Sequence, residues 1–245
     1  MSDMERLGTI HGVGLGPGAP DLLSVRADRL VRGARHIAFF RKKGRPGQAR
    51  RIAAGMLRAD AVEIAMEYPV TTEIPVSDPR YNAMLSSFYT ECTERLMVAA
   101  GSGEDVVVLC EGDPFFYGSF MHLHSRLSGR VPVSVVPGIT GMAGAWNATS
   151  LPICWGDDVL TVVMATLPEE DLVRHIRQTD ALVVMKIGRN LPKLRRAIRA
   201  AGREEQAWLV EHAAMPEQRA TRLVDAQTVT PYFSILLIHG QGRRP

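Results

Sequence analysis

The residues best suited to chemistry lie in the stretch Glu111–Ser119, where two carboxylates, a phenol and two further aromatic rings occur close together. The stretch directly follows Val106–Cys110, an apolar run that predicts a strand buried on both faces. Open α/β sheets bind their ligands at the carboxyl ends of such strands. Gly112 would let a ligand approach the backbone, and Pro114 would make the turn rigid. The stretch therefore predicts either a ligand-binding loop or a plain strand-to-helix turn followed by core aromatic residues.

A second stretch rich in glycine and proline follows the first predicted strand. Gly14, Gly16 and Ala19 formally match the dinucleotide-binding pattern G-x-G-x-x-A. Pro17 and Pro20 argue against that interpretation, because they place rigid turns where the helix should begin and leave fewer N–H groups for a pyrophosphate. The next predicted strand is followed by basic residues, with no acidic residue to hold a ribose diol. A nicotinamide dinucleotide is therefore disfavoured, and the stretch is either a plain connector or a second ligand-binding loop.

Three smaller signals lie at other predicted strand ends. Val136–Gly141 forms a third loop, in which the Thr140 hydroxyl would either cap a helix or contact a ligand. Glu211 and His212 follow a strand and form either a turn or one lip of a cleft. A basic run after the second predicted strand is either a solvated face or a landing site for a polycarboxylate, because Arg and Lys pair well with carboxylates. Its members are Arg41, Lys42, Lys43, Arg45, Arg50 and Arg51.

The composition is that of an ordinary globular protein, with 46% hydrophobic residues, 22% charged residues and a net charge of +3 over 245 residues. The small charge permits an anionic small-molecule substrate, and the clustered basic stripe typical of nucleic-acid binding is missing. The sequence has no apolar stretch of about 18 residues and no signal-peptide pattern at its start. Its three cysteines are widely spaced, which indicates reduced thiols. We therefore expect a cytoplasmic protein that uses no metal, nucleic acid or membrane.

The elements that must position these residues alternate between strands and helices along the chain. In the first half, strands are predicted at 9–14, 36–40, 61–65, 106–110 and 131–136, and helices at 22–31, 48–58, 81–100, 119–127 and 140–148. Asp21 is the expected N-cap of the first helix, and the three prolines within 68–80 predict a loop. In the second half, strands are predicted at 159–165, 181–187, 207–210, 219–224 and 233–238, and helices at 169–178 and 191–201. The pattern predicts two α/β domains, residues 1–150 with a parallel sheet and residues 151–245 with an antiparallel end.

Three such loops, in this order and in an α/β chain of this length, resemble the tetrapyrrole (corrin and porphyrin) methylase family. The resemblance covers nearly the whole chain, and the ordered set is specific although no single loop is. Its segments are Val13–Gly18, Glu111–Pro114, Val136–Thr140, Ala181–Lys186 and Val210–Arg219. Within the family, Glu111–Ser119 and Gly141–Ile153 are most similar to the branch that methylates precorrin-2 at C-20.

The resemblance implies the fold of class III methyltransferases, in which two α/β domains enclose the active site between them, in a homodimer. It implies S-adenosylmethionine as the cofactor and methyl transfer to C-20 of precorrin-2, which gives precorrin-3A in cobalamin biosynthesis. Alternative acceptors are cobalt-factor II, another ring carbon, or the diphthamide precursor of a protein. A nucleotide-sensing module without enzymatic activity is the alternative from another functional class.

Carried over by position, the cofactor site of the family draws on both predicted domains. Pro17 would line its floor, and the loop after the buried strand would contact the amino-acid and ribose portions of the cofactor. The residues implied in the first half are Pro17, Glu111, Gly112, Asp113, Phe116, Thr140 and Gly141. Met185 and Ala213 would enclose the adenine. Relatives often carry other small residues at 213 and 214, which leaves the identity of that last contact open.

No side chain is assigned as catalytic, because the methyl group of a sulfonium is already activated and needs mainly alignment with its acceptor. Should a base be used, the candidates are Glu111, Asp113, Tyr117 and His212. Within the basic run, Arg41 and Lys42 are the expected partners of the substrate carboxylates.

Overall fold

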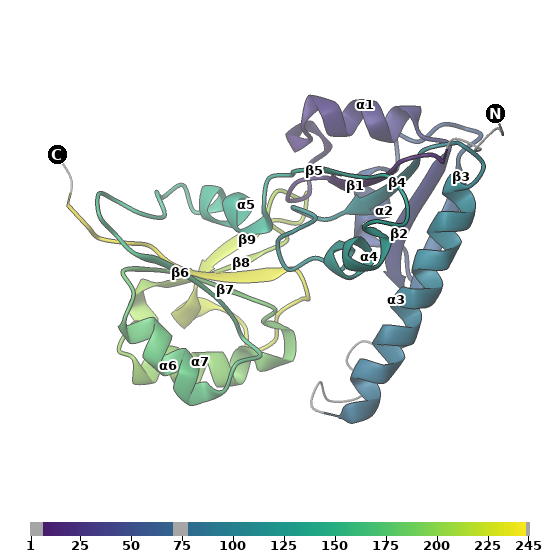
Figure 1. The fold of residues 1–245 in the computed structure, drawn as a ribbon. Helices are drawn as coiled ribbons and strands as arrows, with labels where there is room; N and C mark the ends of the chain where they lie inside the picture. Colours follow the sequence, from purple (N-terminus) through teal and green to yellow (C-terminus); the bar gives the residue numbers. More distant parts are fainter. Residues whose placement is uncertain (1–6, 71–77, 244–245) are drawn as a thin grey trace. The chain divides into compact units, whose positions relative to one another are not determined.

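The computed structural model describes residues 7–70 and 78–243, and its fold is shown in Figure 1. The chain divides into two compact units, Met1–Thr140 and Gly141–Pro245. The sequence had suggested a boundary after residue 150, whereas helix α5 (Gly141–Ala148) is grouped with the second unit. Within residues 7–70 and 78–243, none of the helices combines the length and apolar character that a membrane span requires.

The first unit is built on a five-stranded parallel sheet with the order β3-β2-β4-β1-β5. Its strands are β1 (Ile10–Gly14), β2 (His36–Lys42), β3 (Val62–Tyr68), β4 (Val106–Cys110) and β5 (Val133–Val136). Helices α3 (Pro79–Ala100) and α4 (Phe120–Leu127) pack on one face, and α1 (Val25–Gly33) and α2 (Gln48–Ile52) pack on the other. Because both faces are covered, β1 and β4 are buried along their whole length. The prediction of a doubly buried strand before residue 111 is confirmed.

The second unit has a mixed five-stranded sheet with the order β6-β7-β10-β8-β9. Its strands are β6 (Leu160–Met164), β7 (Ala181–Met185), β8 (Ala207–Glu211), β9 (Arg219–Arg222) and β10 (Ser234–Ile238). Strand β10 runs antiparallel to both of its neighbours, β7 and β8, so the carboxyl ends of β6, β7 and β8 lie at one edge. Helices α6 (Glu169–Arg177) and α7 (Leu191–Ala200) cover one face, and α5 packs on the other. The predicted antiparallel end is confirmed.

Several predicted boundaries are wrong, for local reasons. Residues Pro20–Leu22 form a short 3₁₀ helix, and α1 begins only after Ser24, whose hydroxyl oxygen accepts a hydrogen bond from the Ala27 N–H at 3.2 Å. Asp21 is therefore not the cap. The helix expected at 48–58 ends at Ile52 and continues as turns.

The predicted loop at 68–80 is shorter at both ends than expected. Tyr68 is the last residue of β3, and α3 begins at Pro79, after Asp78 caps it by accepting from the Arg80 N–H at 2.9 Å. The middle of that prediction, residues 71–77, lies outside the described residues.

Candidate active site

Three loops of the first unit meet at the carboxyl edge of its sheet. Strand β4 lies beside β1, and β1 pairs with β5, so the segments that follow these three parallel strands are neighbours. The first two loops are joined backbone to backbone: the Gly112 N–H donates to the Gly16 carbonyl at 2.8 Å, and the Gly16 N–H donates back at 3.3 Å. Both glycines have positive φ, 75° at Gly16 and 63° at Gly112, a conformation that glycine adopts without strain. Pro17 follows directly and is buried.

Asp113 fastens the loop after β4 to the loop after β5. One of its carboxylate oxygens accepts a hydrogen bond from the Gly138 N–H at 3.0 Å, and the other accepts from the Phe115 N–H at 2.9 Å. The approach is close, because a Cβ atom at Gly138 would lie 2.1 Å from the Gly112 carbonyl oxygen. Both oxygens of Asp113 thus bind backbone amides, so the role that the structure gives to this candidate base is to hold the two loops together.

Glu111 faces the first turn of α2. Its carboxylate accepts a hydrogen bond from the Ala49 N–H at 3.0 Å. The residue as a whole is exposed, but protein surrounds its carboxyl group, and this desolvation raises the pKa of Glu111 although the Ala49 hydrogen bond opposes the rise. A carboxyl with a raised pKa at a sheet's ligand edge has the physical character of a proton-handling group.

Aromatic and apolar side chains surround this platform and are exposed to solvent. Phe115 is 48% exposed, Tyr117 is 44% exposed, and Ile139 in the third loop is 43% exposed. The rings of Phe116 and Tyr117 meet edge to face, with centroids 4.9 Å apart. Tyr117 has a φ of 56°, in the left-handed region that side chains other than glycine rarely adopt. Exposed rings on a fixed, strained loop are typical of a ligand wall.

The second unit also contains non-glycine residues with a positive φ, and they lie at the edge of its sheet where the parallel strands end. Met185 ends β7 and is followed by Lys186 with a φ of 53°. Strand β8 is followed by His212 with a φ of 50°, and Ala214 has a φ of 57°. Such residues persist only where their surroundings hold them, and they are frequent at functional sites. The sequence carries no signal for them, because His, Lys and Ala do not mark left-handed positions as glycine does.

A pocket of about 440 Å³ lies beside the end of β8. Glu211, His212 and Arg219 line it together with Thr230, whose hydroxyl donates to the Glu211 carboxylate at 2.9 Å. The His212 N–H donates to the Phe233 carbonyl at 2.8 Å, which fixes the backbone of this lip. The predicted lip residues Glu211 and His212 therefore share one concave surface with mixed charge.

The predicted site residues fall into two groups, one in each unit. The first unit brings Pro17, Glu111, Gly112, Asp113, Phe116 and Thr140 to its carboxyl edge. In the second unit, Gly141 begins α5, Met185 ends β7 and Ala213 follows β8. In neither the range 7–70 nor the range 78–243 do His, Cys, Asp and Glu side chains gather into a set that would hold a metal ion.

The residues of the predicted basic run fall into two groups. Arg41 forms an ion pair with Glu67 at 2.7 Å across β2 and β3, and Arg50 forms one with Glu63 at 2.7 Å. These two arginines fit the interpretation as a solvated face. Lys42 is the last residue of β2, and Lys43 and Arg45 follow it; all three are exposed, at the same edge of the sheet as the three glycine and proline loops.

Comparison with known proteins identifies the family of proteins that share this fold and these loops. The chain belongs to the Tetrapyrrole (Corrin/Porphyrin) Methylases, whose family profile matches residues 9–226. It is 46% identical over 240 residues to a Precorrin-2 C(20)-methyltransferase from Sinorhizobium sp, covering 98% of each chain. It is 25% identical to a Cobalt-precorrin-2 C(20)-methyltransferase from Salmonella typhimurium, covering 96% of this chain and 97% of the relative. Its fold matches that of a uroporphyrin-III C-methyl transferase from Thermus thermophilus complexed with S-adenosyl homocysteine, with a TM-score of 0.67 and 22% identity over 95% of this chain and 97% of that one.

Proposed function

We propose that this chain transfers the methyl group of S-adenosylmethionine to C-20 of precorrin-2 and forms precorrin-3A, a step of cobalamin biosynthesis. The observation that carries the proposal is the 46% identity, across 98% of both chains, with a relative named for this reaction. The three loops at the ligand edge of the first sheet support it, because they provide a rigid backbone platform with few reactive side chains. Such a site suits a reaction that requires alignment more than covalent catalysis.

The residues at the carboxyl edge of the first sheet fit the proposed cofactor. A sulfonium is a cation, and the exposed rings of Phe115 and Tyr117 can attract it through their faces while their apolar surface packs against an adenosine. Met185 and Ala213 in the second unit are the proposed adenine contacts. When bound, S-adenosylmethionine supplies an electrophilic methyl group.

The protein's part in the reaction is positioning. Asp113 holds the Gly112 and Gly138 loops together, and the fixed loops determine where the donor can lie. The nucleophile would be the electron-rich meso carbon C-20 of the substrate. Its bond to the methyl carbon would form as the sulfur–methyl bond breaks and S-adenosylhomocysteine leaves, and C-20 would afterwards lose its proton. The ring nitrogens of the macrocycle can take up charge, so a protein base is optional. Among the candidate bases, Glu111 is the carboxyl whose pKa is raised by desolvation, which favours its protonated form relative to an exposed glutamate.

We propose that the substrate carboxylates lie over the basic loop after β2. The two predicted partners are Arg41, whose guanidinium also pairs with Glu67, and Lys42, which is exposed at the end of β2. Lys43 and Arg45 extend the same exposed positive surface. Charge of this kind raises the local concentration of an anionic substrate and orients it.

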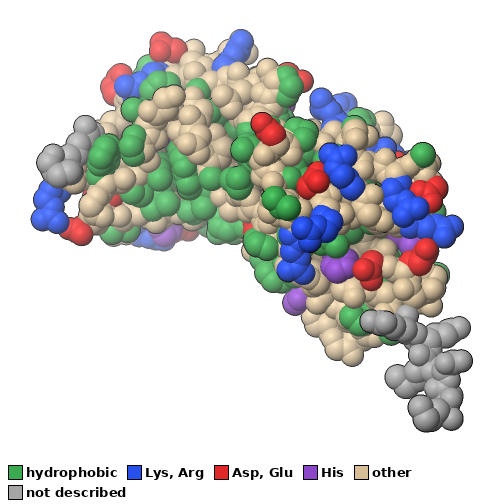
Figure 2. Space-filling view, turned by 90° about the horizontal axis from the view of Figure 1, so that it is seen from above, with side chains coloured by type: hydrophobic (Ala, Val, Ile, Leu, Met, Phe, Trp, Pro, Cys, Tyr) green, Lys and Arg blue, Asp and Glu red, His purple; other side chains and the backbone are tan. Residues whose placement is uncertain are grey.

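We further propose that the protein is a cytoplasmic homodimer. In support, a half-buried apolar face of the second unit includes Trp146, Leu160, Val162, Trp208 and Ile235. Figure 2 shows hydrophobic side chains gathered on this unit, which is on the left in that view. Sedimentation analysis of the protein and of Val162→Glu tests this assembly, because a charge on that face should dissociate a dimer that uses it.

Incubation with precorrin-2 and S-adenosylmethionine labelled with ¹³C in its methyl group tests the reaction. We expect one labelled methyl at C-20, located by NMR. A parallel incubation with the cobalt-loaded tetrapyrrole decides between the metal-free and the cobalt-containing acceptor, for which the Salmonella relative is named. Label at another ring carbon would replace the proposed position, and no transfer to either tetrapyrrole would refute the proposal.

A further inference from the structure

Ser119 immediately precedes helix α4, yet its side chain does not cap that helix. Serine is favoured at this position because its hydroxyl oxygen accepts from an N–H of the first turn. Here the Tyr89 hydroxyl donates to the Ser119 hydroxyl oxygen at 3.3 Å, and the Tyr68 hydroxyl forms a second hydrogen bond with the same atom. The chain therefore uses this serine to join α4 to the end of β3 and to α3.

The two tyrosines are themselves held rigidly in an aromatic cluster. Tyr68 stacks on Phe40 with ring centroids 5.4 Å apart, and Tyr89, which is 5% exposed, stacks on His122 with centroids 4.5 Å apart. Phe88 packs against both tyrosines at 5.1 and 5.2 Å. Burial raises the pKa of Tyr89, so its hydroxyl stays protonated and remains a donor at neutral pH. The hydroxyl groups that reach Ser119 thus come from fixed positions on the face of the sheet covered by α3 and α4 (Figure 1).

The loop that ends at Ser119 contains the strained residue Tyr117. Its upstream part is fixed, because Gly112 pairs with Gly16 and the Asp113 carboxylate binds two backbone amides. Its downstream part is fixed by Ser119. A non-glycine residue with a φ of 56° persists only where the surrounding structure holds it in that conformation.

We propose that Ser119, clamped by the hydroxyls of Tyr68 and Tyr89, is a positioning residue that keeps Tyr117 in its left-handed conformation and thereby fixes the aromatic wall facing the methyl donor. What the wall binds rests on the proposed function, whereas the mechanical link from Ser119 to Tyr117 does not. The clamp acts through Tyr117, so Ser119 need not touch any ligand.

The test compares Ser119→Ala with Ser128→Ala, which removes a hydroxyl from the other end of α4 that donates to the His124 carbonyl at 2.8 Å. Both variants lose hydrogen bonds, so a fall in melting temperature does not distinguish them. We expect Ser119→Ala to weaken the binding of S-adenosylhomocysteine, measured by calorimetry, by about tenfold, the effect of losing one to two neutral hydrogen bonds. Ser128→Ala should bind within about twofold of the wild type. Tyr68→Phe and Tyr89→Phe, which keep the rings, should each show part of the loss.

A second pair of variants, made in a Tyr117→Gly background, tests whether Ser119 acts through Tyr117. Glycine adopts a positive φ without strain, so in a Tyr117→Gly background the additional change Ser119→Ala should alter affinity by less than about twofold. Hydrogen exchange supplies a readout that needs no ligand: the amides of residues 116–119 should exchange faster in Ser119→Ala and unchanged in Ser128→Ala. The proposal is overturned if Ser119→Ala lowers the melting temperature alone, with affinity and exchange as in Ser128→Ala, or if the Tyr117→Gly background leaves its effect on affinity undiminished. A wild-type protein that binds no S-adenosylhomocysteine would instead count against the proposed cofactor, and hydrogen exchange would still decide the role of Ser119.

Discussion

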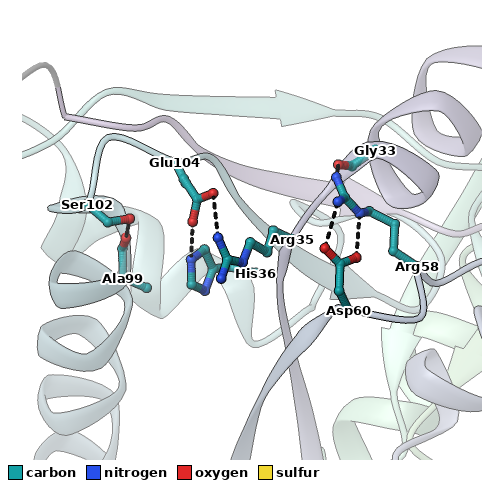
Figure 3. Close-up of polar contacts among 8 residues, drawn as sticks. All are labelled: Gly33, Arg35, His36, Arg58, Asp60, Ala99, Ser102 and Glu104. Carbon is teal, nitrogen blue, oxygen red and sulfur yellow. Dashed lines mark hydrogen bonds and ion pairs between the residues drawn. The ribbon is translucent and has the colours of Figure 1, made fainter.

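The two edges of the first sheet use their polar groups in opposite ways. At the amino edge, side chains pair with side chains: Glu104 binds His36 at 2.9 Å and Arg35 at 3.2 Å, and Arg58 binds Asp60 through two hydrogen bonds (Figure 3). His36 begins β2, and the other four residues directly precede β2, β3 or β4, where the strands enter the sheet. The charges of this edge are largely neutralised within the protein.

At the carboxyl ends of β1, β4 and β5, carboxylates instead bind the backbone, and aromatic rings face solvent. The carboxylates of Asp113 and Glu111 accept from the amides of other segments, and Gly16 and Gly112 pair main chain to main chain. Tyr117 is strained in the same loop. One edge of the sheet is therefore closed by mutual ion pairs, whereas the other is a stiff backbone platform with apolar surface left over for a ligand.

The largest difference between the edges should come from adding one methyl group to a glycine of each. At Gly138 a Cβ atom would lie 2.1 Å from the Gly112 carbonyl oxygen and 2.9 Å from the Gly14 Cα atom, so the backbone itself must move. We expect Gly138→Ala to lose about 3 kcal/mol or more of stability in urea unfolding and to abolish detectable binding of S-adenosylhomocysteine.

Gly33, at the end of α1 near the amino edge, is the matched control. A Cβ atom there would meet no atom within 4 Å. Gly33→Ala should be neutral or stabilise the protein by up to about 1 kcal/mol, with cofactor affinity unchanged. Equal stability losses in the two variants would show that the carboxyl-edge loops are not packed as tightly as their distances imply.

A smaller difference should come from reversing one charge at each edge. Lys42→Glu changes the end of β2, beside the loop that we propose to meet the substrate carboxylates. It should raise the KM for the tetrapyrrole by about five- to tenfold at low salt while the KM for S-adenosylmethionine stays constant. Arg35→Glu gives the same change in net charge at the amino edge and should leave both constants within about twofold. An unchanged KM in Lys42→Glu would return the basic run to the interpretation as a solvated face, and an equal rise in both variants would indicate an effect of net charge alone.

The sequence predicted the layout of the sheets well because the apolar runs are unambiguous. Val106–Cys110 is a short, β-branched apolar run that favours a doubly buried strand, and the glycine and proline residues after it place the loops correctly. Helix starts were less certain where two caps compete, as at Asp21 and Ser24, since both residue types favour that position equally.

The details of the candidate site escaped prediction for a different reason, namely distance along the chain. Ser119 reads as an ordinary helix cap, and its real partners lie 51 and 30 residues away on β3 and α3. Likewise, Arg41 looks like an open cation until β2 and β3 pair in a register that sets it opposite Glu67. Local patterns indicate which residues can interact, and only the assembled sheet decides which of them do.

The smallest effect expected is a pH-dependent one at the amino edge. The hydrogen bond from His36, followed by that from Arg35, holds the pKa of Glu104 below its usual value, although desolvation opposes the shift. A carboxyl whose pKa is lower in the folded than in the unfolded protein stabilises the fold at pH values above its unfolded pKa, about 4.3. It loses that contribution as the pH falls through the folded pKa.

Glu104→Gln should therefore melt slightly below the wild type at pH 7, and the two melting temperatures should converge as the pH is lowered below 4. The loss should be modest because the Glu104 side chain is 40% exposed, and methyl transfer at pH 7 should be unaffected. If Glu104→Gln instead lowered turnover without lowering the melting temperature, the two edges would be coupled and the contrast between them would fail.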